Sequence, residues 1–216
     1  MPNLPTILLI SLELEPYFDE LYTPQIDLLA AHATLQRTQT TDATLRVLTS
    51  PTPPHAVLLT DAALTQKKHV QTWDAVLEYV RNGGTATCMG HFTSFIKPPR
   101  FVPFFSRAGL QWDQEEYLRT TVCLQRGNCP GRYWGAVPER YSQKAVFLKN
   151  VDPGDVWYRT GEESVLESLV WGSVSVRELE GAAVALARVG EGRLGYIGDV
   201  NAEVGSGRVL VALCNL

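Results

Sequence analysis

Long hydrophobic runs are scarce in this chain of 216 residues. The apolar run Ile7–Leu12 is too short for a membrane span or for the core of a signal peptide. The segment before it, Met1–Pro5, carries no basic residue. We therefore expect a cytoplasmic protein without a membrane partner.

A strong excess of one charge is also missing. The formal net charge is −4, and basic residues cluster only in pairs such as Lys67-Lys68, which argues against a nucleic-acid partner. Apolar residues make up 45% of the chain and charged residues 19%, as in a globular protein with a sizeable core. The length fits one domain that covers residues 1–216.

Cysteine is sparse, and its spacing excludes the common metal motifs. The four cysteines form no CxxC pair and lie in no His–Cys cluster: Cys88, Cys123, Cys129 and Cys214. We expect free thiols, no zinc or other metal, and no cofactor.

Apolar runs alternate with segments of helical spacing through the first half of the chain. This alternation predicts a parallel, doubly wound sheet. The predicted strands and helices are Thr6–Leu12, a helix starting at Thr23-Pro24, Thr34–Thr38, Ala43–Leu48, His55–Thr60, Thr65–Arg81, Thr85–Thr87, Phe92–Ile96 and Arg100–Ala108. Residues 110–180 read as a β-rich aromatic insertion, followed by a hairpin (Ala182–Val189, Arg193–Ile197) and a helix at Ser206–Leu213.

The stretch Gly83–Phe92 organises this pattern. Two glycines end a helix, a short β-prone run follows, and Cys88 stands where that run must turn. A turn between a strand and a helix can hold a nucleophile beside the helix N-terminus, where the dipole favours a thiolate.

Cys88-Met89-Gly90-His91 resembles the Cys-x-Gly-His nucleophile turn of class I glutamine amidotransferases. The segments Tyr79–Gly84 and Tyr196–Asp199 are similar to parts of the ThuA-like branch of that superfamily. The resemblance implies a flavodoxin-like three-layer α/β/α sandwich with a mostly parallel central sheet, and homodimerisation follows only from superfamily habit.

Three departures from the amidotransferase pattern predict that glutaminase activity is lost. The family's His-x-Glu pair is replaced by Asn201-Ala202-Glu203, so the base that takes the thiol proton is missing. The glycine-rich oxyanion loop reads Thr60–Ala63, with the carboxylate of Asp61 in it. Phe92 stands where the family usually carries Gln.

The candidate catalytic residues are Cys88, His91 and Glu13. Cys88 is either a nucleophile or a buried apolar residue, and His91 either pairs with the thiol or caps the helix. Glu13 and Glu15 follow the first strand. In the related DJ-1/PfpI branch an acid from this region touches the cysteine, whereas a solvated turn is the alternative.

The candidate ligand-binding residues lie where predicted strands end: Glu15, Met89, Asp61, Asp199, Asn201 and Glu203. The Met89 backbone N–H is a candidate oxyanion donor. The late polar residues suit either a ligand or the cap of the last helix. The aromatics of the insertion either wall a pocket or form a satellite core: Trp112, Tyr117, Tyr133, Trp134, Trp157, Tyr158 and Trp171.

Two functions follow from these residues, and the sequence leaves open whether the chain is an enzyme. The first is a protein of this superfamily that has lost glutaminase activity and binds a small molecule or a protein. The alternative is a cysteine-dependent hydrolase or lyase of the DJ-1/PfpI type, with Cys88 as nucleophile and His91 or Glu13 setting its ionisation.

Overall fold

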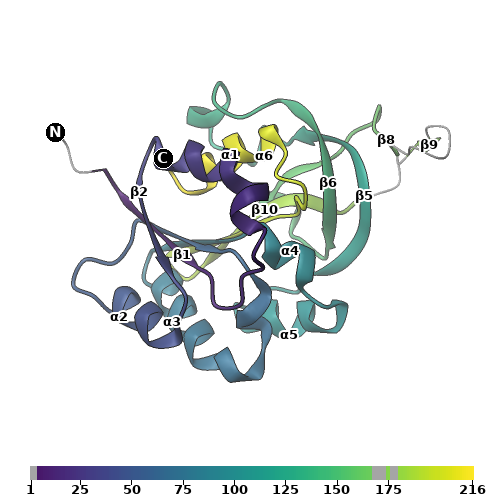
Figure 1. Cartoon of the computed structure of the whole chain (residues 1–216). Helices are drawn as coiled ribbons and strands as arrows, with labels where there is room; N and C mark the ends of the chain where they lie inside the picture. Colours follow the sequence, from purple (N-terminus) through teal and green to yellow (C-terminus); the bar gives the residue numbers. More distant parts are fainter. Residues whose placement is uncertain (1–3, 167–173, 176–179) are drawn as a thin grey trace.

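The computed structural model describes residues 4–166, 174–175 and 180–216. Within these residues, nine strands form one sheet in the order β2-β1-β3-β4-β11-β10-β6-β5-β7. Figure 1 shows α2 (Thr41–Leu48) and α3 (Val70–Arg81) on one side of this sheet and α1 (Phe18–Ala30) and α6 (Val204–Leu213) on the other. The strongly curved strands β5 and β6 lie at the end of the sheet away from α2. Trp171, one of the aromatic residues of the predicted insertion, lies outside the described residues.

The first half of the sheet is parallel. Its strands pair in parallel: β1 (Thr6–Ile10), β2 (Thr34–Thr38), β3 (Ala56–Leu59), β4 (Thr85–Cys88) and β11 (Gly192–Ile197). Helical crossovers join the first four of them, as parallel pairing requires. Side chains alternate between the two faces of β1. Ile7 and Leu9 belong to one buried cluster, and Leu8 and Ile10 to another.

Helices cover both of these faces. One cluster contains Phe18 and Tyr22 of α1 (Phe18–Ala30) together with Val209 of α6 (Val204–Leu213). The other contains Trp73 of α3 and Leu48 of α2, and the bounds of these two helices are Val70–Arg81 and Thr41–Leu48. No helix among the described residues is long and apolar enough to cross a membrane.

The second half of the sheet is antiparallel and closes on itself. β10 pairs with both β6 and β7, and β5 also pairs with both, so the four strands form a closed ring. Their bounds are β5 (Asp113–Leu124), β6 (Arg140–Lys149), β7 (Val156–Thr160) and β10 (Ala182–Val189). The short strands β8 (Val165–Leu166) and β9 (Val174–Ser175) pair separately.

The predicted flavodoxin-like sandwich with a mostly parallel central sheet is therefore wrong. Strand pairing is antiparallel from β11 onward, and four strands close into a barrel. The reason is the hairpin of β10 and β11, which places β10 antiparallel beside the last parallel strand. Three strands of the expected β-rich insertion, β5, β6 and β7, extend this sheet.

Two helix starts also differ from the prediction. The first helix begins at Phe18 and not at Pro24, which lies inside it, because the buried pair Phe18 and Tyr22 extends the apolar face by a turn. The helix expected from Thr65 begins at Val70, after two 3-10 turns at Ala62–Thr65 and Lys67–His69. The predicted hairpin at Ala182–Ile197 is confirmed.

Candidate functional site

The turn after β4 places its strained residue at Gly90. This residue has φ +63° and ψ −125° and immediately precedes the short helix α4 (His91–Phe95). Residues with a side chain rarely adopt such a conformation, and in a nucleophile turn the strained position carries the reactive side chain. Here that position holds a glycine, two residues beyond Cys88.

The space above Gly90 is already filled by α1. A Cβ atom placed on Gly90 would lie 2.9 Å from Cε2 of Phe18 and 3.3 Å from Cζ of Tyr22. Both rings are fully buried and stack on each other, with centroids 4.7 Å apart. A nucleophile at the strained position would have no room for its side chain.

Cys88 is the last residue of β4, between Leu59 of β3 and Tyr196 of β11. Its side chain is fully buried, and burial raises the pKa of the thiol well above its ordinary value. Among the described residues, no hydrogen bond or ion pair joins Cys88 to His91 or Glu13. The environment of Cys88 is that of a packed core thiol.

The backbone N–H of Met89, a candidate oxyanion donor, already has a partner. It donates to the carbonyl oxygen of Leu59 at 3.0 Å, and the Met89 side chain is fully buried. Binding an oxyanion there would require breaking this bond between the strand ends.

His91 lies in an aromatic enclosure. Its ring contacts four other rings at centroid distances of 4.8–5.6 Å, and these belong to Tyr17, Phe18, Tyr22 and Phe95. The residue is 1% exposed, and neither ring nitrogen has a hydrogen-bond partner among the described residues. Burial lowers the pKa of His91, so the ring is neutral at pH 7.

The polar residues after β11 bind one another. Asp199 accepts the backbone N–H groups of Asn201 at 2.8 Å and Glu203 at 2.7 Å, which stabilises the approach to α6. Glu203 forms an ion pair with Arg119 at 2.6 Å. The side-chain amide of Asn201 has one orientation in which both its oxygen and its nitrogen have hydrogen-bond partners. In this orientation its oxygen accepts from the Arg119 guanidinium at 2.8 Å.

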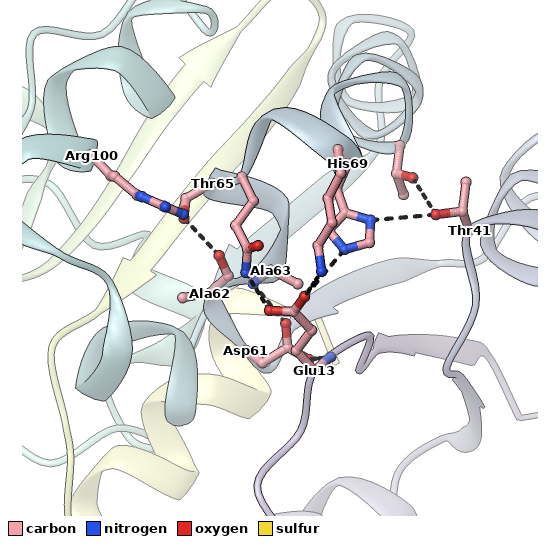
Figure 2. Close-up of polar contacts among 11 residues, drawn as sticks. Glu13, Thr41, Asp61, Ala62, Ala63, Thr65, His69 and Arg100 are labelled. Atoms are coloured by element: carbon pink, nitrogen blue, oxygen red, sulfur yellow. Dashed lines mark hydrogen bonds and ion pairs between the residues drawn. The ribbon is translucent and has the colours of Figure 1, made fainter.

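Glu13 and Asp61 meet at the carboxyl ends of β1 and β3, as Figure 2 shows. The backbone N–H of Glu13 donates to Asp61 Oδ2 at 2.8 Å, and Asp61 Oδ1 accepts the N–H of Ala63 at 2.9 Å. Burial raises the pKa of Asp61. The carboxylate of Asp61 therefore organises the loop that precedes the first 3-10 turn.

The Glu13 carboxylate is held by neighbours from the same loop. It binds Lys68 and Gln66, and it lies 3.7 Å from Nε2 of His69. The bond from Lys68 lowers the pKa of Glu13. On its other side His69 Nδ1 lies 3.5 Å from the Thr41 hydroxyl (Figure 2).

A pocket of about 370 Å³ lies beside this pair of carboxylates. We name it the charged pocket, and its lining includes the acids Glu13, Glu15 and Asp61 and the cations Lys97 and Arg100. Arg100 donates to the Thr65 hydroxyl at 3.4 Å, as drawn in Figure 2. Within the described part of the chain, neither cation forms an ion pair with an acid.

The structure thus divides the predicted site residues. Glu13, Glu15 and Asp61 line the charged pocket, whereas Asn201 lines another pocket of about 300 Å³ beside Thr93 and Ser94 of α4. Cys88 and His91 line neither of these pockets. In the described part of the chain, no group of three or more His, Cys, Asp or Glu side chains is arranged to hold a metal ion.

Sequence reasoning missed the residues that complete this arrangement. Lys97 and Arg100 flank two prolines. Because proline restricts the backbone, this spacing was a signal that the two cations are held in fixed positions relative to each other. Phe18 and Tyr22 fill the space above the turn, and their spacing of four residues was a signal that a helix starts early.

A parallel half-sheet with helices on both faces, followed by an antiparallel ring, is the fold that this chain shares with known structures. A ThuA-like protein from Bacteroides uniformis ATCC 8492 has a TM-score of 0.58 at 12% identity, covering 97% of this chain and 89% of that one. A ThuA-like protein from Parabacteroides merdae ATCC 43184 also has a TM-score of 0.58, at 12% identity over 98% of this chain and 88% of that one. These neighbours show that this chain shares its fold with ThuA-like proteins.

A third similar structure is the β-galactosidase from Bacillus circulans sp. alkalophilus, with a TM-score of 0.62 at 11% identity. The match covers 97% of this chain and 30% of the β-galactosidase chain, so this chain corresponds to less than a third of that enzyme. No family model matches the sequence, and no curated protein matches it. At these identities the likeness concerns the fold alone.

Proposed function

We propose that this chain is an amidotransferase-like protein without glutaminase activity that binds a small molecule in the charged pocket. The observation that carries the first part is the strained turn, where Gly90 replaces a side-chain nucleophile beneath Phe18 and Tyr22. Two further features support it. The Cys88 thiol has a raised pKa, and Asn201 stands where the resemblance implies a histidine base.

The chemistry of the charged pocket supports a ligand that carries both charges. Lys97 and Arg100 provide positive charge without an acidic partner among the described residues, while Glu15 provides a carboxylate without a cationic one. Asp61 and Glu13 add negative charge at the same pocket. A zwitterion, such as a free amino acid, would complement both sets of charges.

Ammonia release from L-glutamine tests the loss of glutaminase activity. We expect the wild-type protein and Cys88→Ala to release ammonia at the same rate as buffer, because neither presents an accessible thiolate at the turn. Ammonia release by wild-type protein that disappears in Cys88→Ala would overturn this part of the proposal.

Thermal unfolding with each of the twenty standard amino acids tests the ligand class. We expect at least one of them to raise the unfolding temperature of the wild-type protein and to lose this effect in Lys97→Gln and Arg100→Gln. Lys67→Gln is the matched control, since Lys67 is exposed and does not line the pocket. If no amino acid shifts the transition, or if Lys67→Gln loses the shift equally, the zwitterion assignment fails.

A further inference from the structure

The second pocket beside α4 differs from the charged pocket in its chemistry. It has a volume of about 300 Å³, and none of the described side chains that line it is charged. We name it the neutral pocket, and its lining includes Gln114, Tyr117, Val146, Asn201, Phe101 and Ser94. The volume lies at the lower end of the range for small-molecule sites.

A β-bulge in β5 aims two side chains into this pocket. Gln114 pairs with Leu148 of β6, and Tyr117 pairs with Val146, so three residue steps along β5 correspond to two along β6. In a regular strand, residues three positions apart point to opposite faces. The extra residue returns Gln114 and Tyr117 to the same face, and bulges are frequent where a strand re-aims a side chain beside a site.

The two re-aimed side chains offer a flat surface and a free amide. Tyr117 is 51% exposed, and its ring is held from one side by Lys144, whose Nζ lies 5.2 Å from the ring centroid. The side-chain amide of Gln114 has no hydrogen-bond partner within the described residues, whereas its backbone N–H donates to Asp113. A large apolar ring left half-exposed beside a free amide is the pattern of a binding surface for a planar molecule.

Two cations that contact lining residues, Arg119 and Lys144, are already engaged. Arg119 pairs with Glu203 and contacts the Asn201 amide, and Lys144 lies against the Tyr117 ring. Because no described side chain in the lining is charged, a charged ligand would lose its hydration on entering this pocket without meeting an opposite charge there, which costs more than the entry of a neutral molecule. The pocket therefore selects against net charge.

We propose that the neutral pocket is a second binding site, for an uncharged planar molecule with an amide or hydroxyl edge. The flat face of the ligand stacks on Tyr117, and its polar edge pairs with the amide of Gln114. This site is independent of the charged pocket and does not rest on the function proposed there, since the two pockets share no lining residue.

Benzamide, benzoate and benzamidine provide a matched series for the test, because they share one shape and carry charges of zero, −1 and +1. Titration of the full chain is followed by two-dimensional amide NMR. We expect benzamide to shift amides of β5, β6 and α4, with benzoate and benzamidine binding at least about threefold more weakly.

Two variants locate the binding. Tyr117→Ala is expected to weaken benzamide binding about tenfold, and Gln114→Leu, which keeps the strand side chain at similar size, about threefold. Tyr17→Ala removes a similarly exposed tyrosine outside the pocket, and Lys67→Gln alters an exposed side chain that lines neither pocket, so both should bind benzamide as the wild type does.

Three results would overturn the proposal. Benzamide producing no shift in the folded wild-type protein would show that the pocket does not bind this class. Equal affinity for the charged analogues would contradict the selection against charge. The third result is that Gln114→Leu binds benzamide as tightly as the wild type, while Tyr117→Ala either also binds it as tightly or does not fold. This result would place the ligand elsewhere.

Discussion

A side chain at Gly90 would be destabilising for two reasons. The backbone has a positive φ, and a Cβ atom would lie too close to two aromatic rings. The two contributions to the free energy of unfolding can be measured separately. Gly109 supplies the comparison, because it also has a positive φ, +83°, but nothing lies within 4 Å of a Cβ atom placed on it. Only Gly90 adds the contact with Phe18 and Tyr22 to the conformational strain.

We predict that Gly109→Ala lowers the free energy of unfolding by about 1 kcal/mol, from conformational strain alone. Gly90→Ala should lower it by about 3 kcal/mol, because overpacking against Phe18 adds to the strain of the φ +63°, ψ −125° conformation. Urea denaturation measures both changes. Equal losses in the two variants would mean that the space above the turn yields readily and is not closed to a side chain.

His91 makes stability depend on pH. The unfolded chain binds a proton at His91 near pH 6.5, whereas burial lowers the pKa in the folded protein. The contribution of the neutral ring is therefore complete above about pH 6.5 and is lost as the pH falls through the lower pKa of the folded state. The Glu15 carboxylate opposes part of this shift.

His91→Phe should remove this component. The substitution keeps a flat ring among Tyr17, Phe18 and Phe95, and it replaces two nitrogens that have no partner among the described residues. We expect the variant to be at least as stable as the wild type at pH 7 and to lose less stability between pH 7 and pH 5. Parallel pH curves for the two proteins would contradict the lowered pKa.

At the scale of elements, Asp199 connects β11 to α6. Its two carboxylate oxygens accept the N–H groups of Asn201 and Glu203, and the second oxygen also accepts from Gln25 of α1 at 3.3 Å. These bonds support the interpretation of Asp199 as the residue that orders the start of the last helix.

Asp199→Ala should therefore destabilise the protein by about 2 kcal/mol, since two part-buried N–H groups lose a charged acceptor. Asp199→Asn keeps one acceptor oxygen and should cost about half as much. Chemical denaturation gives the order of the three proteins. If Asp199→Ala is as stable as the wild type, Asp199 does not order the start of the last helix. The alternative interpretation, ligand binding, would then be favoured.

At the scale of the whole molecule, the hairpin of β10 and β11 joins the parallel half-sheet to the antiparallel ring. β11 pairs with β4 on one side and with β10 on the other, so the two halves share an uninterrupted sheet. The two apolar clusters also extend across the sheet, with Trp73 and Trp112 in one of them. This continuity predicts a single cooperative unit.

Hydrogen exchange tests this prediction. The slowest amides of β3 and β6 should exchange with the same free energy, equal to that of global unfolding, because neither half opens alone. Amides of β6 that exchange with a free energy lower by about 2 kcal/mol or more would show that the ring opens first. The expectation of one domain over residues 1–216 would then need revision.

The sequence by itself determined the local elements whose signals are short-range. The apolar runs of β1 and β3, the glycine after α3 and the hairpin of β10 and β11 are where the pattern predicted them. It also placed Glu13 and Asp61 after the ends of predicted strands, although their contact came only from the structure. These features depend on residues close together in the chain or on one rule of topology.

Only the tertiary structure decided the rest. Closure of the ring depends on β7 pairing with β5 and β10, which lie far apart in sequence and carry no local signal for each other. The position of the strained residue also needed the structure. The sequence pattern placed the turn at Cys88, whereas the strained residue is Gly90, two residues later. The space at that turn is filled by rings from α1, a contact between segments some seventy residues apart. Packing between distant segments thus determines what the turn can hold.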